Sequence, residues 1–209
     1  MKQLTRYLAY PLTMVLAFAV FTGLEGHAPL IVRTFGAVLC GAALVIALEA
    51  YIPYRREWQP GIKDFVNDGS YALFVQILLP KLLTIGFLLV LAWQFQRMDG
   101  IWPHRWPVLA QVLLMVMISD FLRYWLHRFF HTSSLLWRLH EVHHSPDHLY
   151  WLNASRFHPV EKTVQYLVDG LPYVMLGISP EVLAAFFVFY EVNGFYQHGN
   201  MDARFGLLN

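Results

Sequence analysis

The sequence predicts an all-α, polytopic membrane protein. We expect about four transmembrane helices and a helical region at the cytoplasmic face that carries a cluster of histidines. Of the 209 residues, 57% are hydrophobic and 14% are charged, whereas a soluble domain usually has about a quarter charged residues. This leaves too little polar surface to cover a globule in water, so lipid is the natural solvent. The net charge of +1 predicts no nucleic-acid partner.

Four apolar stretches are each long enough to cross about 30 Å of hydrocarbon as a helix. They run over Leu8–Leu24, Phe35–Ile52, Tyr71–Phe95 and Val108–Phe129. Pro80 and Lys81 lie near the middle of the third stretch and predict a kink or a re-entrant turn there. Lys2 and Arg6 before the first stretch also fit a signal peptide, but the apolar run is long and lacks a clean cleavage site. We therefore expect the first stretch to be a span.

Two later stretches, Thr163–Gly177 and Glu181–Tyr196, are apolar but interrupted by polar residues, glycine and proline. They fit either a helical hairpin that dips into the membrane or a further pair of spans, and the sequence leaves both open. There is no internal repeat and no linker of low complexity, so the chain is predicted to form one membrane domain. Its residues 1–107 supply the N-terminal spans, and residues 108–209 supply the part that carries the histidines.

Positive charge predicts the orientation, because lysine and arginine are enriched in cytoplasmic loops. Basic residues precede the first span, lie between the second and third, and follow the fourth, whereas the opposite loops carry few. This bias places the N-terminus and the histidine cluster in the cytoplasm.

The segment from Asp120 to His144, which begins within the fourth stretch, contains five histidines within 18 residues. His127 and His131 are four residues apart and stack on one helical face. After a polar break, His140, His143 and His144 share one side of a second helical segment. Imidazole suits Fe, Zn, Cu and Ni, and so many ionisable rings near hydrocarbon are costly unless something coordinates them. The pattern therefore predicts a metal site without selecting the metal.

Two residues that precede the first histidine on the same helical face are candidates for supporting roles. Asp120 is expected to orient His127 through the ring nitrogen that does not bind metal, and a structural ion pair with Arg123 is the alternative. Tyr124 is expected to pack beside the histidines or to donate a hydrogen bond there.

Two further histidines are candidate ligands. His158 precedes Pro159, which fits the first position of a helix, so His158 can be a helix cap or a ligand. His198 lies at the end of the last apolar stretch. Glu161 falls in the first turn of the helix that Pro159 begins, where a carboxylate favours the helix dipole, and Glu141 is expected to be solvated.

Four motifs resemble those of the fatty acid hydroxylase superfamily, the membrane group of sterol desaturases, methylsterol oxidases and alkylglycerol monooxygenases. The motifs are HRFFH (His127 to His131), HEVHH (His140 to His144), RFHPVE (Arg156 to Glu161) and QHGN (Gln197 to Asn200). The resemblance covers the chain from about Ser119 onward, so residues 108–209 are expected to form a fatty acid hydroxylase-like domain. The first hundred residues match only as generic spans.

The resemblance implies a histidine-ligated pair of non-haem irons that activates O2 to hydroxylate or desaturate a lipid C–H bond. Electrons would come from a separate donor of the reductase, cytochrome or ferredoxin type. The ligands that it implies are His127, His131, His140, His143, His144 and His198.

The sequence differs from the family pattern at the C-terminal end. The family has another HxxHH box shortly after the segment that matches Asp202–Asn209, and this sequence stops before it. Two irons need roughly eight to ten imidazoles, and the chain offers seven when His158 is included. We therefore expect a C-terminal truncation, with one metal held well and a second held poorly, or an inactive chain.

Two other classes of function fit a histidine cluster. A zinc-dependent membrane hydrolase would use fewer ligands and a general base, for which Glu141 or Glu161 is the nearest candidate. A metal transporter or sensor would place its ionisable ligands midway through the spans, whereas these histidines cluster at span ends. The sequence favours the iron oxidase over both, and it does not identify the lipid, the carbon or the outcome of the oxidation.

Overall fold

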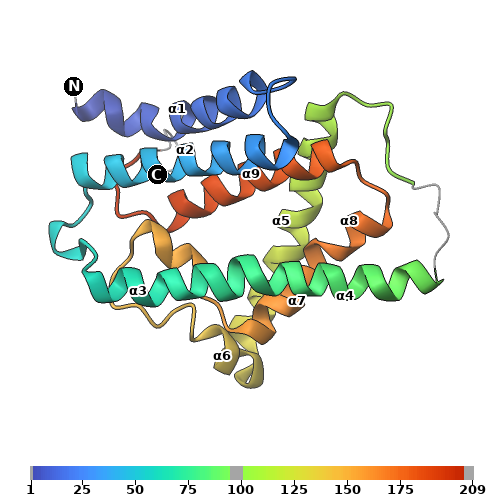
Figure 1. Ribbon diagram of the computed structural model, residues 1–209. Helices are drawn as coiled ribbons and strands as arrows, with labels where there is room; N and C mark the ends of the chain where they lie inside the picture. The colour runs from blue at the N-terminus through green and yellow to red at the C-terminus, as the bar shows by residue number, and fades with distance from the viewer. Residues whose placement is uncertain (1, 95–100, 205–209) are drawn as a thin grey trace. The chain divides into compact units, whose positions relative to one another are not determined.

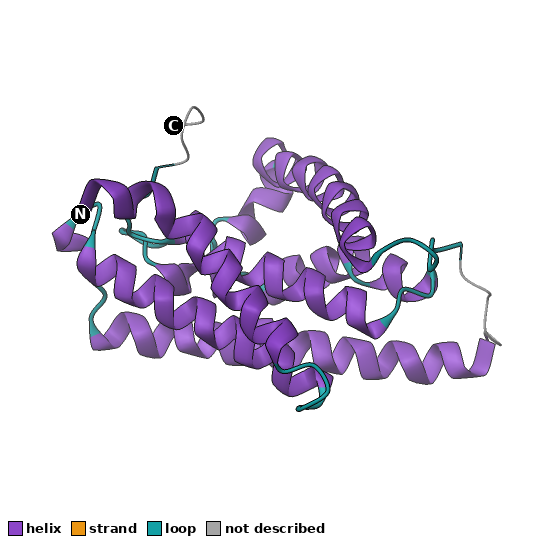
Figure 2. Ribbon diagram, turned by 90° about the horizontal axis from the view of Figure 1, so that it is seen from above, coloured by secondary structure: helices purple, strands orange, loops and turns teal. Residues whose placement is uncertain are grey.

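The computed structural model describes residues 2–94 and 101–204, and helices joined by loops make up this part of the chain. The helices are drawn in Figure 2, where no strand is seen in the described part of the chain. This confirms the all-α prediction. The α-helices are α1 (Lys2–Gly23), α2 (Leu30–Tyr51), α3 (Ile62–Tyr71), α4 (Leu79–Gln94), α5 (Val108–Thr132), α6 (Ser134–His140), α7 (Pro159–Asp169), α8 (Leu171–Met175) and α9 (Pro180–His198). Shorter helical elements are η1 (Arg56–Trp58), η2 (Ala72–Leu78) and η3 (Trp151–Ser155).

Among the described residues, four helical runs are long and apolar enough to cross a membrane, which confirms the predicted number of spans. They cover Gln3–Gly23, Leu30–Tyr51, Ile62–Gly86 and Val108–Thr132. The third run begins at Ile62, nine residues before the predicted start at Tyr71, because the polar residues of α3 hide its helical character in a hydropathy profile. The predicted end of that span, Phe95, lies outside the described residues.

The region around Pro80 is continuous helix, since α3, η2 and α4 follow one another from Ile62 to Gln94 (Figure 1). Of the two alternatives predicted from Pro80, the re-entrant turn is therefore wrong, and the kink stays a prediction. Directly before the proline, Ala72–Leu78 forms a π-helix. Proline has no N–H to donate and its ring crowds the carbonyl four residues earlier, and the wider π-helical turn accommodates both effects without ending the helix.

The chain divides into two compact units that alternate along the sequence. The first contains Met1–Ile62, Asp147–Ala154 and Leu183–Asn209, and the second contains Lys63–Pro146 and Ser155–Val182. Both therefore combine segments from early and late in the sequence. The division into residues 1–107 and 108–209 stays a prediction.

In the first unit, α1 and α2 form an antiparallel pair and α9 packs along them (Figure 1). The contact between α2 and α9 is close, because a Cβ atom on Gly41 would lie 2.5 Å from the side chain of Val192. The Tyr10 hydroxyl donates to the Asn193 side-chain oxygen at 2.9 Å, and the Thr13 and Tyr196 hydroxyls are 2.9 Å apart. These polar contacts tie the first helix of the chain to the last.

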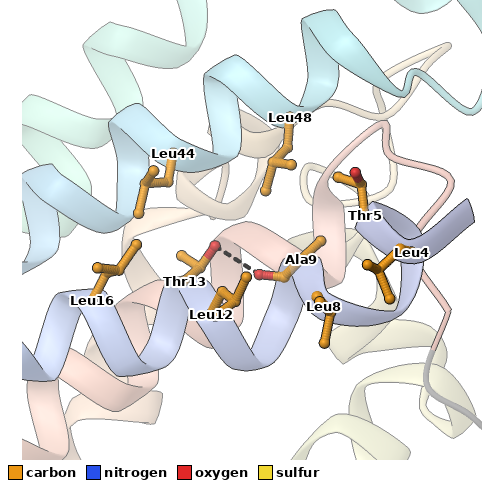
Figure 3. Close-up of a pocket in the computed structure, with 9 residues that line it drawn as sticks. All are labelled: Leu4, Thr5, Leu8, Ala9, Leu12, Thr13, Leu16, Leu44 and Leu48. Carbon is orange, nitrogen blue, oxygen red and sulfur yellow. Dashed lines mark hydrogen bonds between the residues drawn. The ribbon is translucent and has the colours of Figure 1, made fainter. Parts of the chain in front are cut away.

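An apolar groove with a volume of about 370 Å³ runs between α1 and α2 (Figure 3). Six leucines line it: Leu4, Leu8, Leu12, Leu16, Leu44 and Leu48. The hydroxyl of Thr13 is turned to the Ala9 carbonyl, to which it donates at 2.9 Å. The groove therefore presents hydrocarbon, which suits contact with lipid acyl chains.

Of the two later apolar stretches, the first forms the short helices α7 and α8, and the second forms the longer helix α9. With eleven residues, α7 is about 16 Å long, and α8 has five residues. Both are too short to cross the hydrocarbon core. The break between them falls at Gly170, where an added Cβ would lie 2.9 Å from the Tyr166 carbonyl oxygen. α9 is not among the four runs that qualify as spans in the described part of the chain.

Candidate metal centre

Two helices of the second unit, α5 and α6, present the histidines. α5 ends at Thr132, and Ser133 then caps α6 by accepting a hydrogen bond from the Leu136 N–H at 3.4 Å. α6 ends at His140, after which the chain makes a turn through His144 (Figure 1). The tight connection brings the last turns of α5 against α6 and the turn that follows.

Four histidines converge at this place: His127 and His131 of α5, His140 at the end of α6, and His144 of the turn. One nitrogen from each ring lies within 4.8 Å of those of the other three. The Nε2 atoms of His127 and His131 are 3.0 Å apart, and those of His140 and His144 are 3.2 Å apart. The rings thus direct Nε2 atoms at one small volume.

A buried carboxylate holds one of these rings. The side chain of Glu161 on α7 has no exposed surface, and its Oε1 accepts from His140 Nδ1 at 2.7 Å and from Gln165 Nε2 at 3.1 Å. Because a carboxylate accepts and does not donate, the proton of His140 lies on Nδ1 and the lone pair lies on Nε2. A carboxylate that fixes the tautomer of a histidine in this way is typical of metal sites.

The donor set fits a transition-metal ion such as iron. With metal–nitrogen bonds of about 2.1 Å, neighbouring ligand nitrogens are roughly 3.0 Å apart at right angles and roughly 3.4 Å apart in a tetrahedron. The two measured Nε2 separations match this range. Glu161 gives a second sign of fit, because its Oε2 is buried and has no hydrogen-bond partner. An ionised carboxylate buried beside neutral partners is costly unless a cation lies nearby.

His143 lies beside the cluster but is held separately. Its Nδ1 donates to the carbonyl oxygen of Arg156 at 3.1 Å, and its ring stacks on Phe157 with centroids 4.4 Å apart and planes at 9°. Its ring centroid is 5.4 Å from that of His140 and 5.3 Å from that of His144. As in His140, the hydrogen bond through Nδ1 leaves Nε2 as the atom that can bind a metal.

The sequence allowed His158 to be either a helix cap or a metal ligand, and in the structure it caps α7. Its Nδ1 accepts from the Val160 N–H at 3.2 Å at the start of α7. In a neutral ring the proton is then on Nε2, so neither nitrogen has a lone pair left for a metal while the cap is formed. The predicted ligand role of His158 stays a prediction.

His198 belongs to the first unit, where it ends α9. Its Nδ1 donates to the Gly194 carbonyl oxygen at 2.9 Å, and burial lowers the pKa of its ring below the usual value. The ring is therefore neutral at physiological pH, which is the form that binds metals. Its ligand role also stays a prediction.

The turn that follows His198 is fixed by residues from the N-terminal part of the chain. The buried carboxylate of Glu49 on α2 accepts from the backbone N–H groups of Trp151 and Asn200 at 2.8 and 2.7 Å. The side chain of Asn200 in turn accepts from the Arg55 N–H and donates to the Arg55 carbonyl. The N-terminal spans therefore do more than cross the membrane, since they hold the QHGN motif.

Asp120 and Tyr124 are exposed on α5, about two turns and one turn before His127. Their supporting roles stay predictions. The carboxylate that lies against a cluster histidine is that of Glu161, for which the sequence predicted a role at the helix dipole or, in a hydrolase, as a general base. No local pattern could pair Glu161 with His140, because 21 residues separate them. Its place in the RFHPVE motif was the available signal.

The comparison with known proteins agrees with the motifs. Residues 112–209 match the model of the fatty acid hydroxylase family. This stretch contains all seven histidines that were predicted as ligands. Residues 112–209 are therefore similar to the fatty acid hydroxylase superfamily, and the resemblance inferred from the histidine boxes is confirmed.

Three curated relatives illustrate the range of this superfamily. The chain is 29% identical over 182 residues to the ornithine lipid hydroxylase OlsE of Rhizobium tropici, a match that covers 84% of this chain and 55% of that protein. It is 37% identical over 70 residues to methylsterol monooxygenase 2-1 of Arabidopsis thaliana, covering 32% of this chain and 26% of the relative. It is 28% identical over 113 residues to the Delta(7)-sterol 5(6)-desaturase of Leptosphaeria maculans, covering 47% and 29%.

The chain thus spans about half of the ornithine lipid hydroxylase and less of the other two relatives. No solved structure matches it significantly. In the part of the chain that the structure describes, four helices are long and apolar enough to cross a membrane, which indicates an integral membrane protein.

Proposed function

We propose that this protein is an iron-dependent membrane oxidase that uses O2 to hydroxylate or desaturate a lipid C–H bond. The observation that carries the proposal is the cluster of His127, His131, His140 and His144, whose ligand atoms lie within 4.8 Å of one another. The cluster lies within the part of the chain that matches the fatty acid hydroxylase family. Membrane-spanning helices on the same chain support a substrate that is itself a membrane lipid.

The chain's own residues would hold the metal and fix the ligand geometry. The four clustered histidines would bind one iron through Nε2, while Glu161 keeps the proton of His140 on Nδ1. His143, anchored to the Arg156 carbonyl, would contribute to a second iron. A bound pair of non-haem irons would supply the reduction of O2 and the removal of hydrogen from an unactivated C–H bond, which protein side chains cannot perform alone.

We infer hydroxylation as the first outcome to test, because the relative that matches 84% of this chain is named as an ornithine lipid hydroxylase. The reaction balances as R–H with O2, two electrons and two protons giving R–OH and water. The electrons would come from a separate reductase, cytochrome or ferredoxin. The excess of basic residues near the N-terminus and after the fourth span favours a cytoplasmic histidine cluster, where such donors are found.

The proposal is tested with detergent-purified protein loaded with ferrous iron, an ornithine-containing lipid, a chemical or protein electron donor and ¹⁸O2. Mass spectrometry should find one ¹⁸O atom in the lipid product, and the His131→Ala variant should lose both iron and product. Product whose oxygen comes from water, or activity with zinc in the absence of O2, would overturn the proposal and favour a hydrolase.

A further inference from the structure

We propose that Asp68, on α3, is a positioning residue for the metal ligand His143 and acts through Arg156. The inference deepens the proposed function and rests on it, because it takes His143 as a ligand. It assigns a role to one of the first hundred residues, which resemble the family only as generic spans.

The contacts begin at a buried ion pair. The carboxylate of Asp68 has no exposed surface, and its Oδ1 accepts from Arg156 at 2.6 Å through Nε and at 2.5 Å through the terminal amino group. The side chain of Arg156 is itself mostly buried. The hydroxyl of Ser155 donates to the backbone carbonyl of Asp68 at 3.0 Å. Two neighbouring residues are thus fixed to one residue of α3.

The anchored segment then holds His143. The carbonyl oxygen of Arg156 accepts from His143 Nδ1, and the ring of the next residue, Phe157, stacks on the imidazole. Arg156 also donates to the hydroxyl of Ser145 at 3.2 Å, directly after the HEVHH motif. The position of the backbone at Arg156 therefore sets both the tautomer and the ring plane of His143.

The free-energy cost of burying the charges of Asp68 and Arg156 indicates a role beyond packing. A buried ion pair contributes little net stability compared with apolar residues, but removal of one partner leaves a buried charge. The second unit contains another such pair, formed by Arg123 on α5 and the buried Asp169 on α7. Each pair joins an arginine to a largely buried aspartate, and the Asp68–Arg156 pair is the more deeply buried and leads on to His143. This contrast supplies a matched control.

The test measures Co²⁺ binding, which reports ligand geometry through visible absorption and does not depend on turnover. Full-length wild-type protein in detergent is compared with the His143→Ala, Asp68→Asn and Asp169→Asn variants, and with the double variant of Asp68 and His143. His143→Ala defines the share of Co²⁺ binding that depends on this ring. We expect Asp68→Asn to weaken that same share about 10- to 100-fold, as loss of a residue that orients a ligand usually does. In the double variant, Asp68→Asn should add no further loss.

The control and the outcomes separate this inference from the proposed function. Asp169→Asn should lower thermal stability and leave the Co²⁺ titration unchanged. If Asp68→Asn does not fold, Ser155→Ala removes the smaller anchor and should weaken the same share of binding. Wild-type affinity in these variants, or an equal loss with and without His143, would overturn the inference while the proposed function stands. Wild-type protein that binds no Co²⁺ and no iron would overturn both.

Discussion

Glu161 offers the most direct check on the candidate metal centre. The prediction is that Glu161→Ala lowers the affinity for Co²⁺ or Fe²⁺ about 100-fold, and that Glu161→Gln lowers it about 10-fold. A loss of this size corresponds to roughly 1.4–2.7 kcal/mol of binding free energy. Both variants should retain the helical fold, since Glu161 lies in the first turn of α7.

The difference between the two variants follows from the contacts of Glu161. Alanine leaves the buried Nδ1–H of His140 without its acceptor, which costs about 1–3 kcal/mol and frees the ring to rotate. Glutamine keeps an acceptor oxygen for His140 and loses the charge, and charged acceptors form hydrogen bonds roughly twice as strong as neutral ones. Its amide nitrogen would occupy the position of Oε2, which has no partner.

The assay is a Co²⁺ titration followed by visible absorption, with thermal unfolding measured on the same samples. Gln165→Leu is the matched control. It removes the other hydrogen bond to Oε1 of Glu161 and keeps the bond between Glu161 and His140. It should leave the affinity within a few-fold of wild type. Wild-type affinity in Glu161→Ala would refute the reasoning, because the carboxylate would then have no part in orienting a ligand.

Three further predictions follow from the site and its supports. Chelation should lower the midpoint of thermal unfolding, and free metal at about 1,000 times its dissociation constant should restore about 4 kcal/mol; an unchanged midpoint in calorimetry would argue against a metal bound to the folded state. Glu49→Ala should destabilise the protein by about 2–5 kcal/mol, because two backbone N–H groups lose their acceptor, and Glu49→Gln should recover part of this in a denaturation experiment in detergent. His158→Asn keeps a cap that can accept from the Val160 N–H, so iron content by elemental analysis should match wild type; a loss of iron would show that His158 is a ligand.

The features of the fold that the sequence predicted are those encoded locally. Hydropathy over about twenty residues located four spans, and the four-residue spacing of His127 and His131 put both rings on one face of α5. The same reasoning misplaced the start of the third span, because Asp68 and the other polar residues of α3 lower its hydropathy. The structure explains that polarity, since Asp68 is buried against Arg156.

The features that the sequence could not predict are tertiary contacts between residues far apart in the chain. Glu161 reaches His140 across 21 residues, and the Arg156 carbonyl reaches His143 across 13. Glu49 reaches Asn200 across 151 residues. A carboxylate in an apolar helix shows in the sequence that some partner must exist, but neither its spacing nor its neighbours identify that partner.

The hydrogen bonds of the ring nitrogens give a common rule for the predicted ligands. His140, His143 and His198 each use Nδ1 to reach an oxygen acceptor: a carboxylate, a backbone carbonyl of another segment, and a carbonyl of the same helix. In each neutral ring the lone pair is then on Nε2. His158 has the opposite arrangement, because its Nδ1 accepts from a backbone N–H. Three of these four rings therefore carry the proton on Nδ1 and the lone pair on Nε2. The contacts that fix this tautomer also fix the ring, so that metal binding through Nε2 needs little rearrangement of these side chains.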